Sequence, residues 1–159
     1  MTGDTRVRRL FSARTRNAVL TFHIAVSVGL LGDSAGFLAV AIRAARADDP
    51  AAVMEMMRVL NMFAFVFGIP LSFASLISGI LLGFGTKWGV LRYPWVIAKL
   101  LLILSVIVVG GVAIGPVLDT MLAGGTGGSG RLIAAAAYDV VALAVATGFS
   151  VFKPGKRLR

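Results

Sequence analysis

The chain has 159 residues, of which 58% are hydrophobic and 14% are charged, and it carries a formal net charge of +9 with no cysteine. Soluble domains are about 45–50% apolar and about 25% charged, so this composition excludes an ordinary water-soluble domain. The lack of cysteine excludes disulfides and thiolate metal sites. The chain length leaves room for one bundle and for no separate soluble domain.

Long apolar runs fill most of the sequence. They cover residues 17–41, 59–86, 93–118 and 132–152. A helix needs roughly 20 mostly apolar residues to cross about 30 Å of hydrocarbon, and each run meets that length. We therefore predict an all-α, four-helix transmembrane bundle. Its helices are expected at about residues 17–43, 56–85, 93–115 and 131–152, within a domain of residues 17–152 between a basic N-terminal segment (1–16) and a basic tail (153–159).

The first predicted helix, residues 17–43, carries glycines and Asp33 on one face. In lipid, helices are held together by close approach over small residues, so this face is expected to point into the bundle. An aspartate in the middle of a span costs roughly 2.5–3.5 kcal/mol and normally faces the bundle interior or water. His23, the only histidine, lies nearer the start of the same helix.

The second predicted helix, residues 56–85, has a narrow stripe of small residues. The stripe consists of Gly68, Ser72, Ser75, Gly79 and Gly83, and Pro70 near the middle is expected to kink the helix. We predict that the stripe packs inside the bundle, with a homodimer through Ser75, Gly79 and Gly83 as the alternative.

Methionines gather at the outer start of this helix and in the other outer loop. They are Met54, Met56, Met57, Met62 and Met121. Thioethers are soft ligands that suit Cu(I), so an outer-face copper site is one interpretation. The other is that flexible methionine side chains serve packing.

The third predicted helix starts at Pro94 and ends near Pro116, and Lys99 is its one charged residue. Trp88, Tyr93 and Trp95 flank its inner end and are expected to form an interfacial aromatic belt. A glycine-rich segment, residues 124–130, then predicts a flexible outer connector without the residues that would complete a phosphate-binding loop. The fourth predicted helix, residues 131–152, carries Asp139 on a face of alanines.

Basic residues are unevenly distributed between the two sides of the predicted bundle. One side has Arg6, Arg8, Arg9, Arg14, Arg16, Lys87, Arg92, Lys153, Lys156, Arg157 and Arg159, and the other has Arg43, Arg46, Arg58 and Arg131. This asymmetry predicts that both termini are cytoplasmic. It also predicts contact with anionic lipid headgroups at that face, and it argues against nucleic acid as the partner of the positive charge.

Three polar residues define a candidate intramembrane site. Asp33 lies about 12–15 Å, and Asp139 about 12 Å, from the outer end of its helix, so their depths match. They are expected to meet in one outer-half pocket, with Asn61 as a third member. The functional interpretation is a proton, cation or ligand site. The structural one is a pair of hydrogen-bonded acids that lock helices together, with Asp33 able to reach Arg43 or a backbone group instead.

A second polar layer is expected near the inner face, formed by His23, Lys99 and Arg92. Lys99 is long enough to extend its amine to the headgroups. A single histidine excludes a bis-histidine haem and a zinc site built from several histidines. No cofactor is expected.

Segments in helix one and at the inner turn carry a family resemblance. They read Leu20-Thr21-Phe22-His23, Val28-Gly29-Leu30-Leu31-Gly32, Thr86-Lys87-Trp88-Gly89 and Arg92-Tyr93-Pro94-Trp95-Val96-Ile97-Ala98-Lys99. With them the chain resembles small uncharacterised four-helix membrane proteins of bacteria, a domain of unknown function. The resemblance implies the bacterial inner membrane and no reaction, and it directs attention to His23, Trp88, Arg92, Trp95 and Lys99. The layout is also faintly similar to copper-resistance membrane domains, but this chain lacks their expected additional histidines.

Two functions remain open from the sequence. The first is a non-enzymatic accessory or scaffold subunit of a larger membrane complex, expected because no nucleophile–base arrangement or cofactor motif is evident. The second is a small transporter or proton/cation pathway that uses Asp33 and Asp139. Cu(I) handling by the outer methionines is a weaker third.

Overall fold

The computed structural model describes residues 12–85 and 93–152, which form α-helices and two π-helical turns. In chain order the elements are α1 (Ala13–Ala44), α2 (Pro50–Met62), η1 (Phe63–Gly68), α3 (Ile69–Gly85), α4 (Pro94–Val109), η2 (Gly110–Ile114), α5 (Gly115–Leu122) and α6 (Ser129–Phe152). Because η1 and η2 continue the helices around them, four spans result, each long and apolar enough to cross a membrane. The predicted four-helix transmembrane architecture is confirmed.

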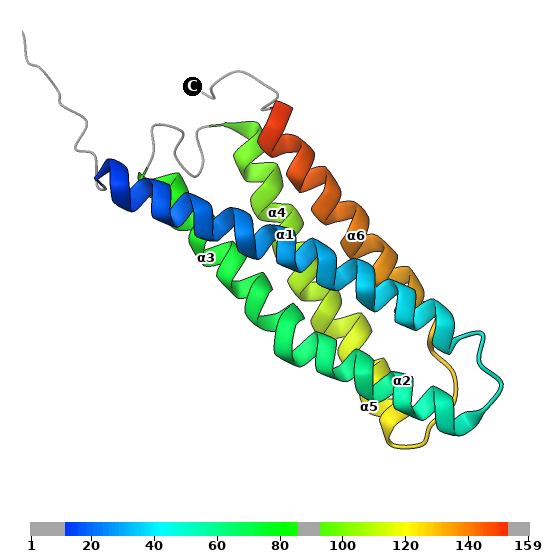
Figure 1. The fold of residues 1–159 in the computed structure, drawn as a ribbon. Helices are drawn as coiled ribbons and strands as arrows, with labels where there is room; N and C mark the ends of the chain where they lie inside the picture. Colours follow the sequence, from blue (N-terminus) through cyan, green and yellow to red (C-terminus); the bar gives the residue numbers. More distant parts are fainter. Residues whose placement is uncertain (1–11, 86–92, 153–159) are drawn as a thin grey trace, which may run out of the picture.

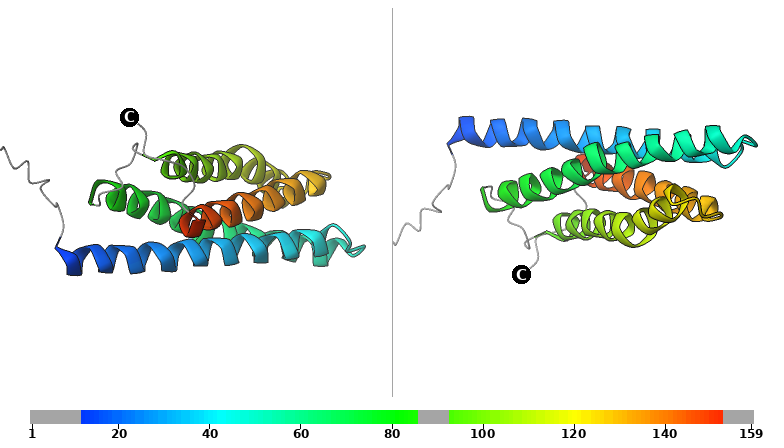
Figure 2. Two further views of the ribbon diagram at one scale, coloured as in Figure 1. Left: turned by 90° about the horizontal axis from the view of Figure 1, so that it is seen from above. Right: turned by 90° about the horizontal axis from the view of Figure 1, so that it is seen from below.

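The four spans form a bundle in which α1 and α4 lie on opposite sides (Figures 1 and 2). Helices α3 and α6 each pack against both α1 and α4. Helix α1 begins and α6 ends at the same end of the bundle, which we call the terminal end (Figure 1). Helices α2 and α5 lie at the opposite, far end.

The second span begins earlier than the sequence predicted, at Pro50 rather than near residue 56. Asp49 caps the helix because its carboxylate accepts the amides of Ala51 at 3.1 Å and Ala52 at 3.3 Å. Pro50 suits the first turn, where its missing N–H costs no hydrogen bond. This cap and proline extend the helix six residues beyond the predicted start.

The third span continues past Pro116 to Leu122, although the sequence predicted an end near residue 115. Pro116 cannot donate to the carbonyl of Val112, and the π-helical turn η2 accommodates it. The Arg131 guanidinium from α6 donates to that Val112 carbonyl at 2.5 Å. An arginine side chain thus replaces the backbone donor, and the helix does not end.

The far end of the bundle contains the larger apolar core. Leu60, Leu118 and Leu132 are almost fully buried there, and Phe37 of α1 packs into the same cluster. A smaller cluster lies nearer the terminal end and consists of Leu30, Val106, Ala142 and Leu143. Large apolar side chains also cover the outside of the spans, as expected of surfaces that face lipid.

Candidate functional site

Polar side chains line the contact between α1 and α3 in the half of the bundle nearer the terminal end. On α1 they are His23, Ser27 and Asp33, and on α3 they are Ser72, Ser75 and Ser78; we call these six residues the polar seam. The three α3 serines are buried. Helices α1 and α3 run antiparallel, so residue numbers rise along α1 while those of the opposing residues on α3 fall (Figure 1).

Hydrogen bonds connect the two helices at two levels of the seam. His23 Nδ1 lies 2.9 Å from Ser78 Oγ, and Ser78 Oγ donates to the Ala74 carbonyl at 2.6 Å. Because the hydroxyl proton is used in that second bond, Nδ1–H of His23 is the donor in the first. One turn further along, the hydroxyls of Ser27 and Ser75 lie 3.1 Å apart. Hydroxyl groups both donate and accept, so the seam is a series of groups that can exchange hydrogen bonds.

Small residues on η1 and α3 permit this close approach. A Cβ added at Gly79 would lie 3.3 Å from Cε1 of His23, and one added at Gly68 would lie 3.3 Å from Oδ2 of Asp33. Gly83 is also buried. The small-residue stripe predicted from the sequence therefore packs against α1 within one chain.

Asp33 ends the polar seam in the middle of the bundle. Its Oδ2 lies beside Gly68, the last residue of η1, on the side where the Phe63 carbonyl also approaches. Its Oδ1 is buried and has no hydrogen-bond partner among the described residues. Beyond Asp33 toward the far end, the Phe63 ring lies against Gly36, at 3.0 Å from the position of an added Cβ. The polar series therefore stops at the carboxylate, and apolar packing continues from there.

Asp139 lies on α6 at about the depth of Asp33. Leu30 packs with Leu143, and Phe37 packs in one cluster with Ala135, so antiparallel register brings Asp139 level with residues 33–34 of α1. Asp139 is 7% exposed, and its Oδ1 is buried without a partner among the described residues. Within the described residues, no hydrogen bond joins the two aspartates. Asp33 lies against η1 of the second span, whereas Asp139 lies on the buried side of α6.

Asn61 lies apart from Asp33. Gly36 of α1 is opposite Phe63 and Asp33 is opposite Gly68, so Asn61 falls near residues 39–40 of α1. At 1.5 Å per residue this is about 10 Å farther toward the far end than Asp33. The structure therefore does not bring Asn61 to the carboxylate that the sequence grouped with it.

His23 and Lys99 each hydrogen-bond to a serine on a neighbouring helix. The Lys99 Nζ of α4 donates to Ser150 Oγ of α6 at 2.6 Å. The lysine thus links α4 to α6, while the histidine links α1 to α3.

The other predicted residues are distributed around the terminal end. Tyr93 and Trp95 lie together at the start of α4 with ring centroids 6.4 Å apart. Arg92 and Trp88 lie outside the described residues, as do the tail 153–159 and most of the N-terminal segment.

The methionines are mostly part of the far-end core. Met57 and Met121 are buried in it, and Met56 packs against it, whereas Met62 is exposed. Within residues 12–85 and 93–152, no group of three or more His, Asp or Glu side chains is arranged to hold a metal ion. The Cu(I) interpretation remains an untested prediction, and packing accounts for the positions of the buried thioethers.

The sequence did not predict the side-chain hydrogen bonds of several residues in and around the site. Ser27 and Ser78 are the clearest examples, together with Ser150 and Arg131. A signal was present for Ser27, because His23 and Ser27 are four residues apart and so share one helix face. No comparable signal pairs Arg131 with a carbonyl 19 residues earlier in the chain.

Comparisons with known proteins agree with this architecture. No curated protein and no solved structure matches the chain. A family model described as "Predicted integral membrane protein (DUF2269)" matches residues 17–152, which span all four helices. The chain therefore belongs to this family of integral membrane proteins.

Proposed function

We propose that the protein is a small, non-enzymatic membrane carrier for protons or small cations, and that Asp33 is the central acceptor. The observation that carries this proposal is the polar seam ending at a carboxylate whose buried Oδ1 has no partner in the part of the chain that the structure describes. Ionisable residues inside membrane spans commonly mark ion pathways and proton relays.

The surroundings of Asp33 support a binding role. Membrane carriers often bind ions where a helix departs from regular α-geometry and exposes backbone carbonyls beside an acid. Here the carboxylate lies next to Gly68 and the Phe63 carbonyl, at the two ends of the π-helical turn η1. Such turns are frequent at functional sites.

The route to Asp33 runs from the terminal end. The imidazole of His23 and the hydroxyls of Ser27, Ser75 and Ser78 supply successive donors and acceptors along α1 and α3. Asp139, at the same depth on the other side of α1, is the second acid of the pathway in this proposal. We propose that it serves exchange with the far end, since the polar seam stops at Asp33.

Proton flux into liposomes tests this function. Purified protein is reconstituted with a pH-sensitive dye inside, and flux is driven by a potassium gradient with valinomycin. Wild-type protein is expected to conduct above protein-free liposomes, and D33N and D139N are expected to abolish that flux. D119N is the matched control, because Asp119 is exposed on α5. Wild-type flux equal to that of empty liposomes, or unchanged flux in D33N, would contradict the proposal.

An accessory role in a larger complex is the second candidate. It is supported by the outer surface of α4 and η2, where Gly110 and Gly111 have nothing within 4 Å of an added Cβ and large apolar residues such as Val108 are exposed. Exposed small residues allow another transmembrane helix to approach the backbone closely.

Tagged purification in mild detergent, with mass spectrometry of co-eluting proteins, tests this second candidate. This candidate would be supported by a stoichiometric partner that co-elutes with the wild type and with G32L but not with G111L. Gly32 is the matched control because it also has open space around it but lies on α1. Elution of the chain alone from native membranes would contradict it.

We further propose that the terminal end faces the cytoplasm of a bacterial cell. The support is the excess of basic residues in the segments that the predicted topology assigns to the side of the two termini. Because the chain has no cysteine, a single introduced cysteine reports on which side of the membrane its position lies. A membrane-impermeant maleimide added to intact cells is expected to label T126C and not S12C, and the reverse pattern would overturn the orientation.

A further inference from the structure

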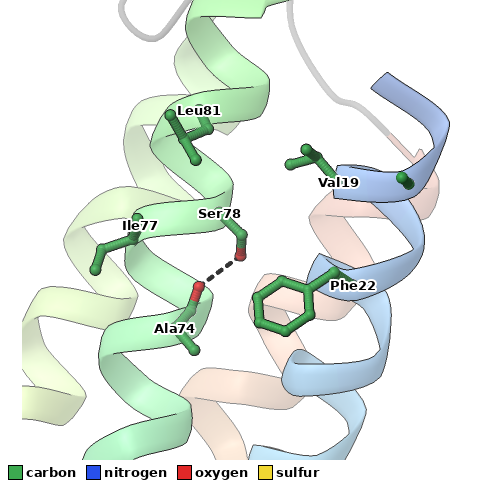
Figure 3. A pocket seen from close by; sticks show the side chains of 7 residues that line it. Val19, Phe22, Ala74, Ile77, Ser78 and Leu81 are labelled. Atoms are coloured by element: carbon green, nitrogen blue, oxygen red, sulfur yellow. Dashed lines mark hydrogen bonds between the residues drawn. The ribbon is translucent and has the colours of Figure 1, made fainter. Parts of the chain in front are cut away.

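An open groove lies between α1 and α3 near the terminal end, on the outer side of the polar seam. It has a volume of about 420 Å³. Its walls are formed by Ala18, Val19 and Phe22 of α1 and by Ala74, Ile77, Ser78 and Leu81 of α3. Figure 3 shows Phe22 facing α3 across the groove, with Ile77 and Leu81 on the opposite wall.

The chemistry of the groove suits an alkyl chain. Six of its seven lining residues are apolar, and the seventh, Ser78, has its hydroxyl bonded to both His23 and the Ala74 carbonyl. The groove therefore presents no polar group that a hydrophilic ligand would satisfy. Filling it with hydrocarbon leaves these hydrogen bonds intact.

A positive charge stands at the mouth of the groove. Arg14, Ala18 and Phe22 are spaced by four residues on α1, so Arg14 continues the groove-lining face by one turn toward the terminal end. Arg14 is exposed, and no carboxylate within residues 12–85 and 93–152 forms an ion pair with it. Arg16, two residues on, instead directs its Nη2 to Asn17 at 3.4 Å.

The length of α1 allows Arg14 to reach headgroup depth. A helix of 32 residues is about 48 Å long, which exceeds the roughly 30 Å of hydrocarbon. The start of α1 extends past the neighbouring ends of α3 and α4 (Figure 2). This excess length allows the apolar residues from Ala18 onward to lie in the hydrocarbon while Arg14 reaches the phosphates.

We propose that this groove binds one acyl chain of an anionic phospholipid whose headgroup is held by Arg14. A guanidinium binds phosphate oxygens well, and a basic residue at the membrane surface favours anionic over zwitterionic lipid. The site lies beside the His23–Ser78 bond, so the bound chain covers the outer side of the polar seam at its terminal end. This role is separate from ion binding at Asp33 and does not depend on it.

Fluorescence quenching by brominated lipid tests the proposal. A tryptophan reporter is introduced as F22W, in the groove, or as L20W, on a different face of α1, in a background carrying W88F and W95F. Vesicles contain phosphatidylcholine with a rising fraction of phosphatidylglycerol brominated on its acyl chains. The reporter at position 22 is expected to show about a fivefold preference for the anionic lipid, and the reporter at position 20 is expected to show none.

Adding R14Q is expected to reduce the preference at position 22 to that at position 20, and 10 mM inorganic phosphate is expected to leave it unchanged. Equal preferences at the two positions, retention of the preference in R14Q, or competition by free phosphate would overturn the proposal. Native mass spectrometry of the otherwise unaltered chain provides a second measurement that needs no reporter. One phosphatidylglycerol is expected to stay bound to the wild type and to be lost from R14Q, and equal retention by both would also overturn it.

Discussion

Two of the spans contain a proline in their interior, and the surroundings of the two prolines differ. Pro70 follows the π-helical turn η1, and Pro116 follows the π-helical turn η2. At Pro116 the carbonyl that loses its backbone donor accepts a hydrogen bond from Arg131. At Pro70 the neighbouring helix instead places Asp33 beside the last residue of the turn.

The same backbone irregularity therefore supports two different arrangements. At η2 a basic side chain supplies the hydrogen bond that the proline cannot donate, so its role there is structural. At η1 an acidic side chain lies beside the turn, and its Oδ1 has no hydrogen-bond partner within residues 12–85 and 93–152. This contrast predicts that substitutions at η1 change transport and that substitutions at η2 change stability.

The largest effect is expected from G68A. An added methyl group would lie 3.3 Å from Asp33 Oδ2, closer than neighbouring groups normally allow, so the carboxylate must move. We expect proton flux in liposomes to fall about tenfold or more, because small displacements of a binding group are costly. G111A is the matched control at η2, where an added Cβ meets nothing within 4 Å. Equal flux in the two variants would remove η1 from the pathway.

R131M is expected to destabilise the bundle without changing flux per folded molecule. The substitution leaves the Val112 carbonyl without the donor that replaces the proline N–H. Losing the partner of a polar group in an apolar setting costs about 1–3 kcal/mol, measurable by reversible unfolding in mixed micelles. R58M is the control, since Arg58 forms only an exposed ion pair with Glu55 at 3.2 Å and such pairs contribute little.

A double-mutant cycle between Pro116 and Arg131 sharpens this interpretation. P116A restores a backbone N–H that can reach the Val112 carbonyl, so R131M should cost less in that background. We expect the two substitutions to couple by about 1 kcal/mol in the unfolding free energy. Additive effects would show that Arg131 stabilises the bundle by some means other than capping this carbonyl.

The sequence predicted the architecture well because length and hydropathy nearly determine transmembrane spans. It also predicted the α3 stripe, since glycine and serine spacing alone defines a helix face. It did not predict how the chain passes Pro116, because the compensating Arg131 lies on another helix. It grouped Asn61 with Asp33 because the sequence does not reveal the register between the two helices. In the structure that register sets the two residues about two helical turns apart.

The smallest effect is expected from the hydroxyls that follow each turn. Ser72 Oγ donates to the Gly68 carbonyl at 2.6 Å, and Thr120 Oγ1 donates to the Pro116 carbonyl at 2.7 Å. Ser72 is buried beside η1, whereas Thr120 is exposed at the far end. Hydrogen bonds inside membrane proteins average about 0.6 kcal/mol, so S72A should lower the unfolding free energy by about that amount and T120V by less. Because Ser72 bonds to the turn that faces Asp33, we also expect S72A to reduce flux and T120V to leave it unchanged. Equal flux in the two variants would confine the role of η1 in transport to Gly68 and Asp33.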